Sequence, residues 1–377
     1  MNDSRTCSRC VYDTTIPGIR FDGNGVCNFC HIHDGLDKSF PLNATGRQRL
    51  ESMIETIKRE GKNAEYDCVV GVSGGRDSTY TLYLAKKMGL RPLAVHFDNG
   101  WNSEIAVSNI KNSTNKLGVD LHTVVADWEE FKDLQKSFLM ASVSDAEIPT
   151  DYAIISVLYQ EAARFGIRFV LHGHSFRTEG LVPLGWTYMD GRYIKGVHNK
   201  FGHLRITSFP IMTIYDLVYY TLVKRIKSIP FLQYFDYQHK VAMDVIEKEL
   251  DWKFYGGHHH ENTYTHFFQS YYVAVKFGID KRRLEYSALI RSGQMAREAA
   301  LKEIEQSHYL YDKEVIKYTL SKLGLTQNEF DAILSAPRKT FHDYPSYYPI
   351  IKALRIPILV ACKLDLLPPI FYKKYLG

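Results

Sequence analysis

Short apolar runs alternate with amphipathic stretches through the middle of the chain. Four runs rich in β-branched and aromatic residues have the length of buried strands, at 68–72, 91–97, 120–126 and 167–171. The stretches between them place apolar residues three and four positions apart, as in a helix, at 79–88, 103–117, 128–140 and 150–165. Strands and helices in alternation are typical of a parallel sheet covered by helices on both faces. We therefore predict an α/β domain over residues 46–230.

The two ends of the chain follow different patterns. Residues 1–45 hold a group of cysteines and turn-forming glycines, which indicates a small metal-bound module. Residues 231–377 have mainly helical periodicity, and we predict a helical region there that contacts the substrate or a partner. Between 186 and 209, short aromatic runs separated by glycine predict a hairpin or a lid.

The first strand leads into a loop and a helix that together form an anion site. The loop consists of Ser73, Gly74, Gly75, Arg76, Asp77 and Ser78. Its glycines let backbone N–H groups approach an oxyanion, and a helix N-terminus favours negative charge. The SGGRDS form resembles the pyrophosphate loop of the ATP pyrophosphatase (PP-loop) superfamily. That resemblance implies ATP cleaved to AMP and pyrophosphate, with Asp77 helping to hold Mg²⁺; an ordinary serine-glycine turn is the alternative.

Polar residues also follow the second and fourth strands, where α/β sheets bind their ligands. Asp98 and Asn99 could contact the adenosine, while Trp101 could stack on a ligand or pack in the core. Gly173 would allow close approach of the nucleotide, and Glu179 is the favoured second acid near Mg²⁺ or an incoming amine. Other candidates for polyphosphate, metal or substrate contacts are His174, Ser175, Arg177 and Thr178. A solvated loop is the alternative for this segment.

A further cluster, DWKFYGGHHHE, lies at 251–261, where a glycine turn precedes a helix. His259 or Glu261 could transfer protons in a reaction. The plainer alternative is a helix start with Glu261 near the positive end of the helix dipole. The region after it is the most basic of the chain and could close over pyrophosphate or over a nucleotide-linked substrate. Its cationic residues include Lys276, Lys281, Arg282, Arg291 and Arg297.

Two CxxC pairs occupy the first thirty residues, formed by Cys7, Cys10, Cys27 and Cys30. This spacing predicts a structural zinc ribbon, because each pair can direct two thiolates at one tetrahedral Zn²⁺. Two disulfides and an iron–sulfur cluster are the alternatives. A ribbon of this kind can also bind nucleic acid.

Composition limits the classes of function. The 377 residues are 45% hydrophobic and 24% charged, which are values of a globular protein. A net charge of +5 suits a nucleotide ligand but does not indicate a dedicated nucleic-acid binder. The N-terminus lacks the apolar run of a signal peptide, and no uninterrupted apolar run is long enough for a transmembrane helix. We therefore expect a cytoplasmic protein.

Taken together, these clusters resemble the N-acetyl sugar amidotransferases of bacterial surface-polysaccharide biosynthesis. The resemblance rests on the paired CxxC motifs, SGGRDS, FDNGW, WKFYGGHHHENTYTHF, KFGIDKRR and LIRSGQMAREAAL. It implies that an acetamido group of a nucleotide-activated sugar becomes an acetamidino group, for lipopolysaccharide O-antigen synthesis. The amide oxygen would attack the α-phosphate of ATP, and ammonia would then displace AMP from the adenylated imidate. The resemblance further implies two partners as the ammonia source, a glutaminase subunit and a cyclase-like barrel protein.

Two other functions are compatible with these motifs. A PP-loop tRNA-modifying enzyme, such as a thiolase or a lysidine-type ligase, would share the loop and the bound metal. A thiolase would need further cysteines, and only Cys68 and Cys362 remain outside the CxxC pairs. A zinc-ribbon protein that binds nucleic acid, with a degenerate nucleotide domain, is the third possibility, and the intact SGGRDS argues against it.

Overall fold

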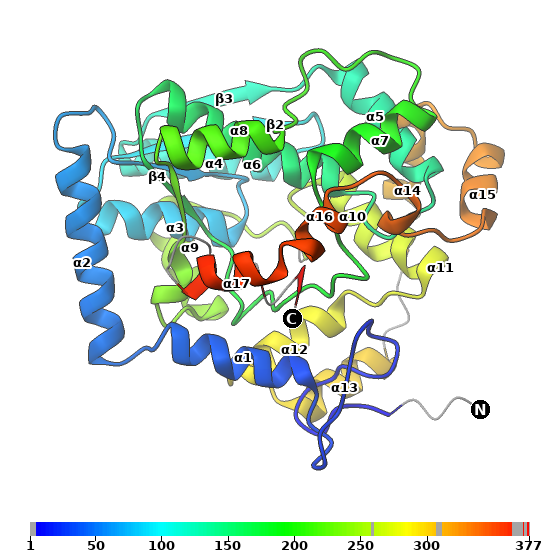
Figure 1. Cartoon of the computed structure of the whole chain (residues 1–377), viewed down its shortest axis with the longest axis horizontal. Helices are drawn as coiled ribbons and strands as arrows, with labels where there is room; N and C mark the ends of the chain where they lie inside the picture. The colour runs from blue at the N-terminus through cyan, green and yellow to red at the C-terminus, as the bar shows by residue number, and fades with distance from the viewer. Residues whose placement is uncertain (1–4, 258–259, 307–310, 364–371, 373–374, 377) are drawn as a thin grey trace.

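A computed structural model describes residues 5–257, 260–306, 311–363, 372 and 375–376 of the chain. Its centre is a five-stranded sheet in the order β3-β2-β1-β4-β5, with every strand parallel to its neighbours (Figure 1). The strands are β1 (Cys68–Gly71), β2 (Pro92–Asp98), β3 (Leu121–Val125), β4 (Phe169–His172) and β5 (Lys227–Pro230). The structure confirms the predicted parallel sheet and its first four strands.

Strand β5 was missed by the sequence pattern. Its four residues, KSIP, contain a single buried apolar side chain, that of Ile229, and so give no strand signal. It extends the sheet at the β4 edge, pairing from Phe169 with Lys227 to His172 with Pro230. An edge position tolerates a short strand that ends in proline, because its outer side needs no hydrogen-bond partner in the sheet.

Helices cover both faces of the sheet, as predicted. One face carries α3 (Arg76–Lys87), α4 (Glu104–Leu117) and α9 (His239–Leu250), which contact one another. The other carries α6 (Ile148–Arg164), joined by α7 (Gly191–Phe201) and α5 (Trp128–Met140). Successive strand residues point to opposite faces. Accordingly, Val69 belongs to the core under α6, while its neighbour Val70 belongs to the core under α3.

The remaining elements surround this layered core. They are α1 (Asn28–Ser39), α2 (Ala44–Gly61), α8 (Ile214–Val218) with the π-turn Tyr219–Val223, the 3₁₀ turns Phe231–Tyr234 and Phe341–Asp343, α10 (Thr263–Phe267) with the π-turn Phe268–Tyr272, α11 (Val273–Phe277), α12 (Arg282–Arg291), α13 (Arg297–Gln306), α14 (Lys313–Leu323), α15 (Gln327–Ser335), α16 (Tyr348–Ala353) and α17 (Arg355–Lys363). After β5 the described chain is therefore helical, as predicted. None of the helices in the described part is long and apolar enough to cross a membrane.

The predicted hairpin or lid at 186–209 is wrong, because this segment contains helix α7. Its first turn is capped by Asp190, whose carboxylate accepts a hydrogen bond from the backbone N–H of Tyr193 at 2.6 Å. Its buried side chains, those of Tyr193, Ile194 and Val197, recur at helical spacing. Glycines within this stretch suggested turns and concealed that spacing from the sequence pattern.

Arg177 joins the first helix to the sheet. Its buried guanidinium donates to Asp37 of α1 at 3.0 Å, to the carbonyl of Phe40 at 2.8 Å and to the carbonyl of Gln233 at 2.9 Å. The expectation that Arg177 contacts polyphosphate is therefore corrected. Its donors hold together three segments that are distant in sequence.

We predict that Arg177→Met destabilises the fold by about 3 kcal/mol, because two carbonyls and a carboxylate lose a charged donor. The side chain of Arg177 is only 5% exposed. Arg164→Met is the matched control, since Arg164 is 61% exposed in its ion pair with Glu161. This substitution should lower the free energy of unfolding by less than about 1 kcal/mol. Denaturant unfolding of both variants measures the difference. Equal effects would contradict the role given to Arg177.

Candidate active site and metal centre

The loop between β1 and α3 is held in one conformation by its own hydroxyl groups and by two helices. The Ser78 hydroxyl accepts from the Ser73 N–H at 3.2 Å, and the Ser73 hydroxyl accepts from the Gly75 N–H at 3.2 Å. Gly74 has a left-handed φ of +77°, and a methyl group there would lie 2.3 Å from the carbonyl oxygen of Ala106. Glycine is therefore required at this position by both backbone angle and space.

Two side chains hold the Gly74 carbonyl from outside the loop. The indole N–H of Trp252 donates to this oxygen at 2.9 Å, and the side-chain amide of Asn109 donates at 3.2 Å. The peptide after Gly74 is therefore oriented by α4 and by the segment that follows α9. The loop leads into the N-terminus of α3, where the helix dipole favours an anion.

Asp77 lies at the centre of a buried polar network. The Arg76 guanidinium donates to Asp77 Oδ1 at 2.8 Å, and the hydroxyl of Tyr237 donates to the same oxygen. Burial opposes the charge of Asp77, but the neighbouring Arg76 and the Tyr237 hydrogen bond hold the pKa of its carboxyl well below its usual value. Asp77 is therefore a carboxylate at neutral pH, as the predicted role near Mg²⁺ requires.

His239, at the first position of α9, completes this network. Its Nε2 lies 2.8 Å from Nη2 of Arg76. Burial and the adjacent Arg76 lower the pKa of His239 to about 4, so the ring is neutral and accepts this hydrogen bond. The backbone N–H of His239 donates to Gln294 at 3.0 Å, which ties the network to the chain after α12.

Glu261 lies against the phosphate loop. Residues 101–103 and 261–263 pair as a short antiparallel bridge: the Ser103 N–H donates to the Glu261 carbonyl at 2.8 Å, and the Thr263 N–H donates to the Trp101 carbonyl at 2.9 Å. A methyl group on Gly75 would meet Glu261 Oε1 at 3.0 Å. The loop and the distal cluster, predicted separately, are thus parts of one site. His259 falls outside the described residues.

Tyr255 contacts the start of α3. Its hydroxyl accepts a hydrogen bond from the backbone N–H of Arg76 at 3.4 Å. Burial, followed by the charges of Glu261 and Asp77, raises the pKa of Tyr255 far above its ordinary value. Tyr255 therefore stays a neutral hydroxyl at neutral pH.

Asp98 and Asn99 shape the loop that receives the Glu261 segment. The Asp98 carboxylate accepts a hydrogen bond from the backbone N–H of Gly100 at 2.9 Å. The side-chain oxygen of Asn99 accepts one from the side-chain amide of Asn262 at 3.2 Å. Their contact with adenosine stays a prediction. Trp101 is buried, and its indole N–H donates to Gln135 at 2.8 Å, so Trp101 belongs to the core.

The segment after β4 contributes a paired acid and base. Nδ1 of His174 lies 2.6 Å from Glu179 Oε2. Burial and the neighbouring His174 lower the pKa of His172 to about 3, which keeps that ring neutral. A methyl group on Gly173 would lie 2.8 Å from the Asp77 carbonyl oxygen, so this glycine is needed for packing against α3. The structure thus gives Gly173 a packing role next to the predicted nucleotide site.

Two predicted phosphate ligands are corrected by their contacts. The Lys276 ammonium is buried and donates to the carbonyls of Leu334 and Ala336 at 3.1 and 2.8 Å, so it caps the C-terminus of α15. The Arg282 guanidinium binds Asp280 at 2.8 Å and also contacts a carbonyl near the end of α13. Both cations bind protein groups, and neither is directed at the loop.

The four N-terminal cysteines form a compact, buried cluster. Their Sγ atoms all lie within 4.8 Å of one another, and three of the pairs are 3.6–3.9 Å apart. Thiolates about 2.3 Å from one tetrahedral zinc would be about 3.8 Å apart. In a 4Fe–4S cluster each thiolate binds a different iron and would lie farther from the others. The donors fit a single tetrahedral ion, and none of them is disulfide-bonded.

Arginines from the C-terminal region surround this cluster. The Arg291 guanidinium lies 3.3 Å from Cys30 Sγ and 3.2 Å from Cys10 Sγ, with its plane over the ring of Tyr12. Arg297 donates to the carbonyls of Cys10 and Cys7 at 3.1 and 2.8 Å. Four thiolates with a divalent ion carry net negative charge, which explains these cations. Both arginines were expected at phosphates, so these contacts correct that expectation.

Sequence reasoning missed two members of this site, Tyr237 and His239. Trp252 and Tyr255 lie within the cluster predicted at 251–261, but the sequence assigned no role to either side chain. Tyr237 and His239 lie at the start of an ordinary helix pattern, and only the packing of α9 against α3 brings them to Asp77.

Two family models match separate parts of the chain. Residues 67–156 match the queuosine biosynthesis protein QueC, and residues 261–355 match the C-terminal domain of WbpG-like LPS biosynthesis proteins. The first match contains the SGGRDS loop, and the second begins at Glu261. Together they confirm the predicted resemblance, because the chain joins a PP-loop domain to a WbpG-like C-terminal domain.

A curated relative, an uncharacterised protein of Methanocaldococcus jannaschii, is 28% identical over 174 residues. The alignment spans 45% of this chain and 58% of that relative, so the chain matches little more than half of its length. Among solved structures, the NH3-dependent NAD synthetase of Campylobacter jejuni is 18% identical, with 54% of this chain and 83% of that chain covered and a TM-score of 0.29. The U34-tRNA thiolase NcsA of Methanococcus maripaludis, solved with its 4Fe–4S cluster, is 14% identical, with 86% and 99% covered and a TM-score of 0.33.

We predict that Arg291→Met weakens metal binding at the cysteine cluster by about tenfold or more, because the thiolates lose their nearest cation. Competition with a colorimetric chelator on the full chain measures the affinity. Arg9→Met is the control, since its guanidinium pairs with Asp34 at 2.8 Å in the same module. Equal affinities of the two variants would contradict the role of Arg291.

The neutral state of His239 predicts a pH dependence of stability. Its pKa falls from 6.5 to about 4 on folding, so between these values the unfolded chain binds more protons and stability rises with pH. His239→Gln keeps a hydrogen-bond acceptor for Arg76 but cannot titrate. Its unfolding free energy should change less between pH 4 and 6.5 than that of the unmodified chain, as measured by denaturant unfolding. Identical slopes would contradict a buried neutral His239.

Proposed function

We propose that this chain is an ATP-dependent amidotransferase that converts an acetamido group of a nucleotide-activated N-acetyl sugar into an acetamidino group. The observation that carries the proposal is the position of Glu261. This first residue of the WbpG-like segment lies beside Gly75 of the intact SGGRDS loop. A polysaccharide-related domain and an ATP-handling loop therefore share one site.

Activation of the amide would begin at the loop. The amide oxygen attacks the α-phosphorus of ATP, the bond to the β-phosphate oxygen breaks, and pyrophosphate leaves. Backbone N–H groups of Gly74 and Gly75, the hydroxyls of Ser73 and Ser78 and the N-terminus of α3 would take up the negative charge of pyrophosphate. The Asp77 carboxylate, kept ionised by Arg76, would help to hold Mg²⁺ on the phosphates.

The second half of the reaction needs a group that accepts protons. Ammonia attacks the carbon of the adenylated imidate, AMP leaves with the former amide oxygen, and the nitrogen loses a proton. Glu261 beside the loop and the hydrogen-bonded pair of His174 and Glu179 are the described candidates for this proton transfer. The activation makes chemical sense, because an amide oxygen leaves poorly and a phosphate monoester leaves well.

The cysteine cluster would hold a structural Zn²⁺, because four thiolates leave a tetrahedral ion no open position for substrate. Ammonia would come from a glutaminase subunit delivered through a cyclase-like barrel protein. Both this partnership and a place in lipopolysaccharide O-antigen synthesis are inferred from the family resemblance.

A tRNA-modifying enzyme is the second candidate, favoured by the QueC match over residues 67–156. A thiolase version is disfavoured by the two remaining cysteines. Cys68 is buried within β1, where burial raises the pKa of its thiol, and Cys362 is buried on α17. Neither residue lies in the SGGRDS loop.

The test is nucleotide cleavage by the purified chain with ATP, Mg²⁺, ammonium and a panel of nucleotide-linked N-acetyl sugars. We expect AMP and pyrophosphate together with a sugar whose mass shows oxygen replaced by NH. Glu261→Gln should slow the reaction by about a hundredfold, as is common for loss of a general base. The exposed Glu298→Gln on α13 should leave the rate unchanged and serves as control.

Three outcomes would count against the proposal. AMP formation that depends on tRNA would support the second candidate. Cleavage to ADP would exclude the adenylation chemistry. Full activity of Glu261→Gln would remove that residue from the reaction.

A further inference from the structure

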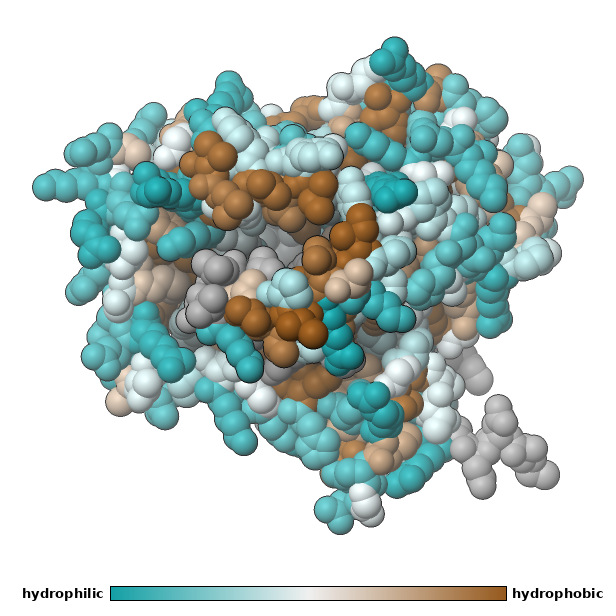
Figure 2. All heavy atoms as spheres, in the orientation of Figure 1, coloured by the Kyte–Doolittle hydropathy of each residue, from teal (hydrophilic) through white to brown (hydrophobic). Residues whose placement is uncertain are grey.

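Two helical segments expose apolar side chains on one face of the molecule. Figure 2 shows these hydrophobic side chains on two sides of a hollow, over α8 and over α16 and α17. On the first segment Tyr215 is 82% and Leu222 is 71% exposed, and on the second Ile356 is 74% exposed. Exposed aliphatic and aromatic residues grouped in this way mark an interaction surface.

The first segment is apolar around almost its whole circumference. Tyr220 and Ile226 face inward, where Tyr220 contacts Tyr159 and Ile226 is buried. The residues that point away from the core are nevertheless also apolar. They are Ile214, Tyr215, Leu217, Val218, Tyr219, Leu222 and Val223. Water is therefore a poor environment for the outer side of this segment.

The second segment repeats the pattern. Over 348–363 the sequence is YPIIKALRIPILVACK, and only Cys362 is buried. Ile350, Leu354, Ile356 and Val360 are all exposed. None of the described helices can cross a membrane, so a segment of this composition would lie on a lipid surface rather than through it.

The charges beside these apolar residues are mostly positive. Residues 348–363 contain Lys352, Arg355 and Lys363 and no acidic residue. The first segment ends with exposed Lys224, Arg225 and Lys227, and its one acid, Asp216, is used in the capping box of α8. Apolar side chains flanked mainly by cations suit anionic head groups at the edge of hydrocarbon. Exposed tyrosines beside such apolar residues are typical of proteins at the lipid–water interface.

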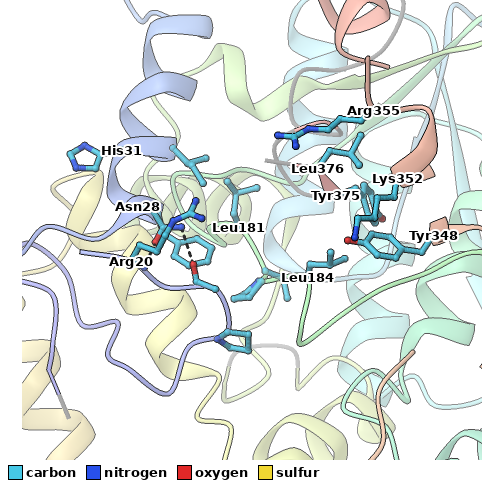
Figure 3. A pocket seen from close by; sticks show the side chains of 16 residues that line it. Arg20, Asn28, His31, Leu181, Leu184, Tyr348, Lys352, Arg355, Tyr375 and Leu376 are labelled. Carbon is cyan, nitrogen blue, oxygen red and sulfur yellow. Dashed lines mark hydrogen bonds between the residues drawn. The ribbon is translucent and has the colours of Figure 1, made fainter. Parts of the chain in front are cut away.

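A pocket beside α16 adds to the cationic character of this face. It has a volume of about 720 Å³ and lies between the start of α1, the loop at 181–184 and α16–α17 (Figure 3). Apolar side chains such as Leu181 and Leu184 line it together with Arg20, Lys352 and Arg355, and no acidic residue is among its lining. Its walls would accept an acidic head group with part of an apolar chain.

We propose that this face, formed by α8 with its π-turn and by α16–α17, binds the surface of an anionic lipid membrane. The occupant is a lipid surface, because an excess of cations around protruding apolar side chains complements lipid phosphates. Binding would hold the chain at a membrane surface through these two helical segments. The inference stands independently of the proposed reaction.

The experiment is cosedimentation of the full chain with phosphatidylcholine vesicles, with and without phosphatidylglycerol. We expect binding to the anionic vesicles that weakens with salt. Leu222→Asp and Ile356→Asp should each reduce it about tenfold, and Lys352→Gln with Arg355→Gln should reduce it selectively for anionic vesicles. Val125→Asp is the matched control, because Val125 is 70% exposed on the β3 edge.

Thermal unfolding of each variant verifies that these surface changes leave the fold intact. Absence of binding to either vesicle, or equal binding by all variants, would overturn the proposal. Light scattering that shows a dimer abolished by Leu222→Asp would also overturn it, because the face would then join two copies of the chain.

Discussion

The short bridge between residues 101–103 and 261–263 is the contact on which the site depends. It fixes a C-terminal segment to the loop after β2 through backbone hydrogen bonds, and its neighbour Asn262 is held by Asn99. Backbone bonds of this kind tolerate changes of side chain, so they set position rather than chemistry. The position they set brings Glu261 to Gly75. Without the bridge, the phosphate loop would be an anion site with no adjacent acid from the second domain.

A second constraint concerns the cations of the C-terminal region. An arginine or lysine that is buried requires an anion or several carbonyl oxygens as partners. Arg291 and Arg297 contact the cysteine cluster. Lys276 donates to carbonyls at the end of α15, and Arg282 pairs with Asp280. The cysteine module is therefore joined to the WbpG-like region by hydrogen bonds from Arg291 and Arg297. In the proposed reaction, the loop, the N-terminus of α3 and Mg²⁺ would instead stabilise the charge of pyrophosphate.

The sequence predicted the parts that local patterns encode. Each of these parts occupies adjacent residues: the valine-rich strands, the SGGRDS loop and the paired CxxC motifs. The structure contains all three. Sequence-based prediction failed where a residue's contact partner lies far away along the chain. Nothing near Lys276 or Arg291 tells whether the cation meets a phosphate, a helix end or a thiolate. For the same reason Tyr237 and His239 were missed, since only the packing of α9 on α3 brings them to Asp77. The short edge strand β5 and helix α7 were missed because weak apolar content and internal glycines removed their periodicity.

The central claim is that one site uses ATP to activate an amide, and the fate of a single oxygen atom tests it most directly. A nucleotide-linked N-acetyl sugar would carry a heavy oxygen isotope in its acetamido group, and the AMP formed with ammonium would be analysed by mass spectrometry. If the amide oxygen attacks the α-phosphate, the heavy isotope must leave in AMP. Unlabelled AMP alongside an amidine product would contradict the account, because the amide would then have been activated by some route other than adenylation at the SGGRDS loop.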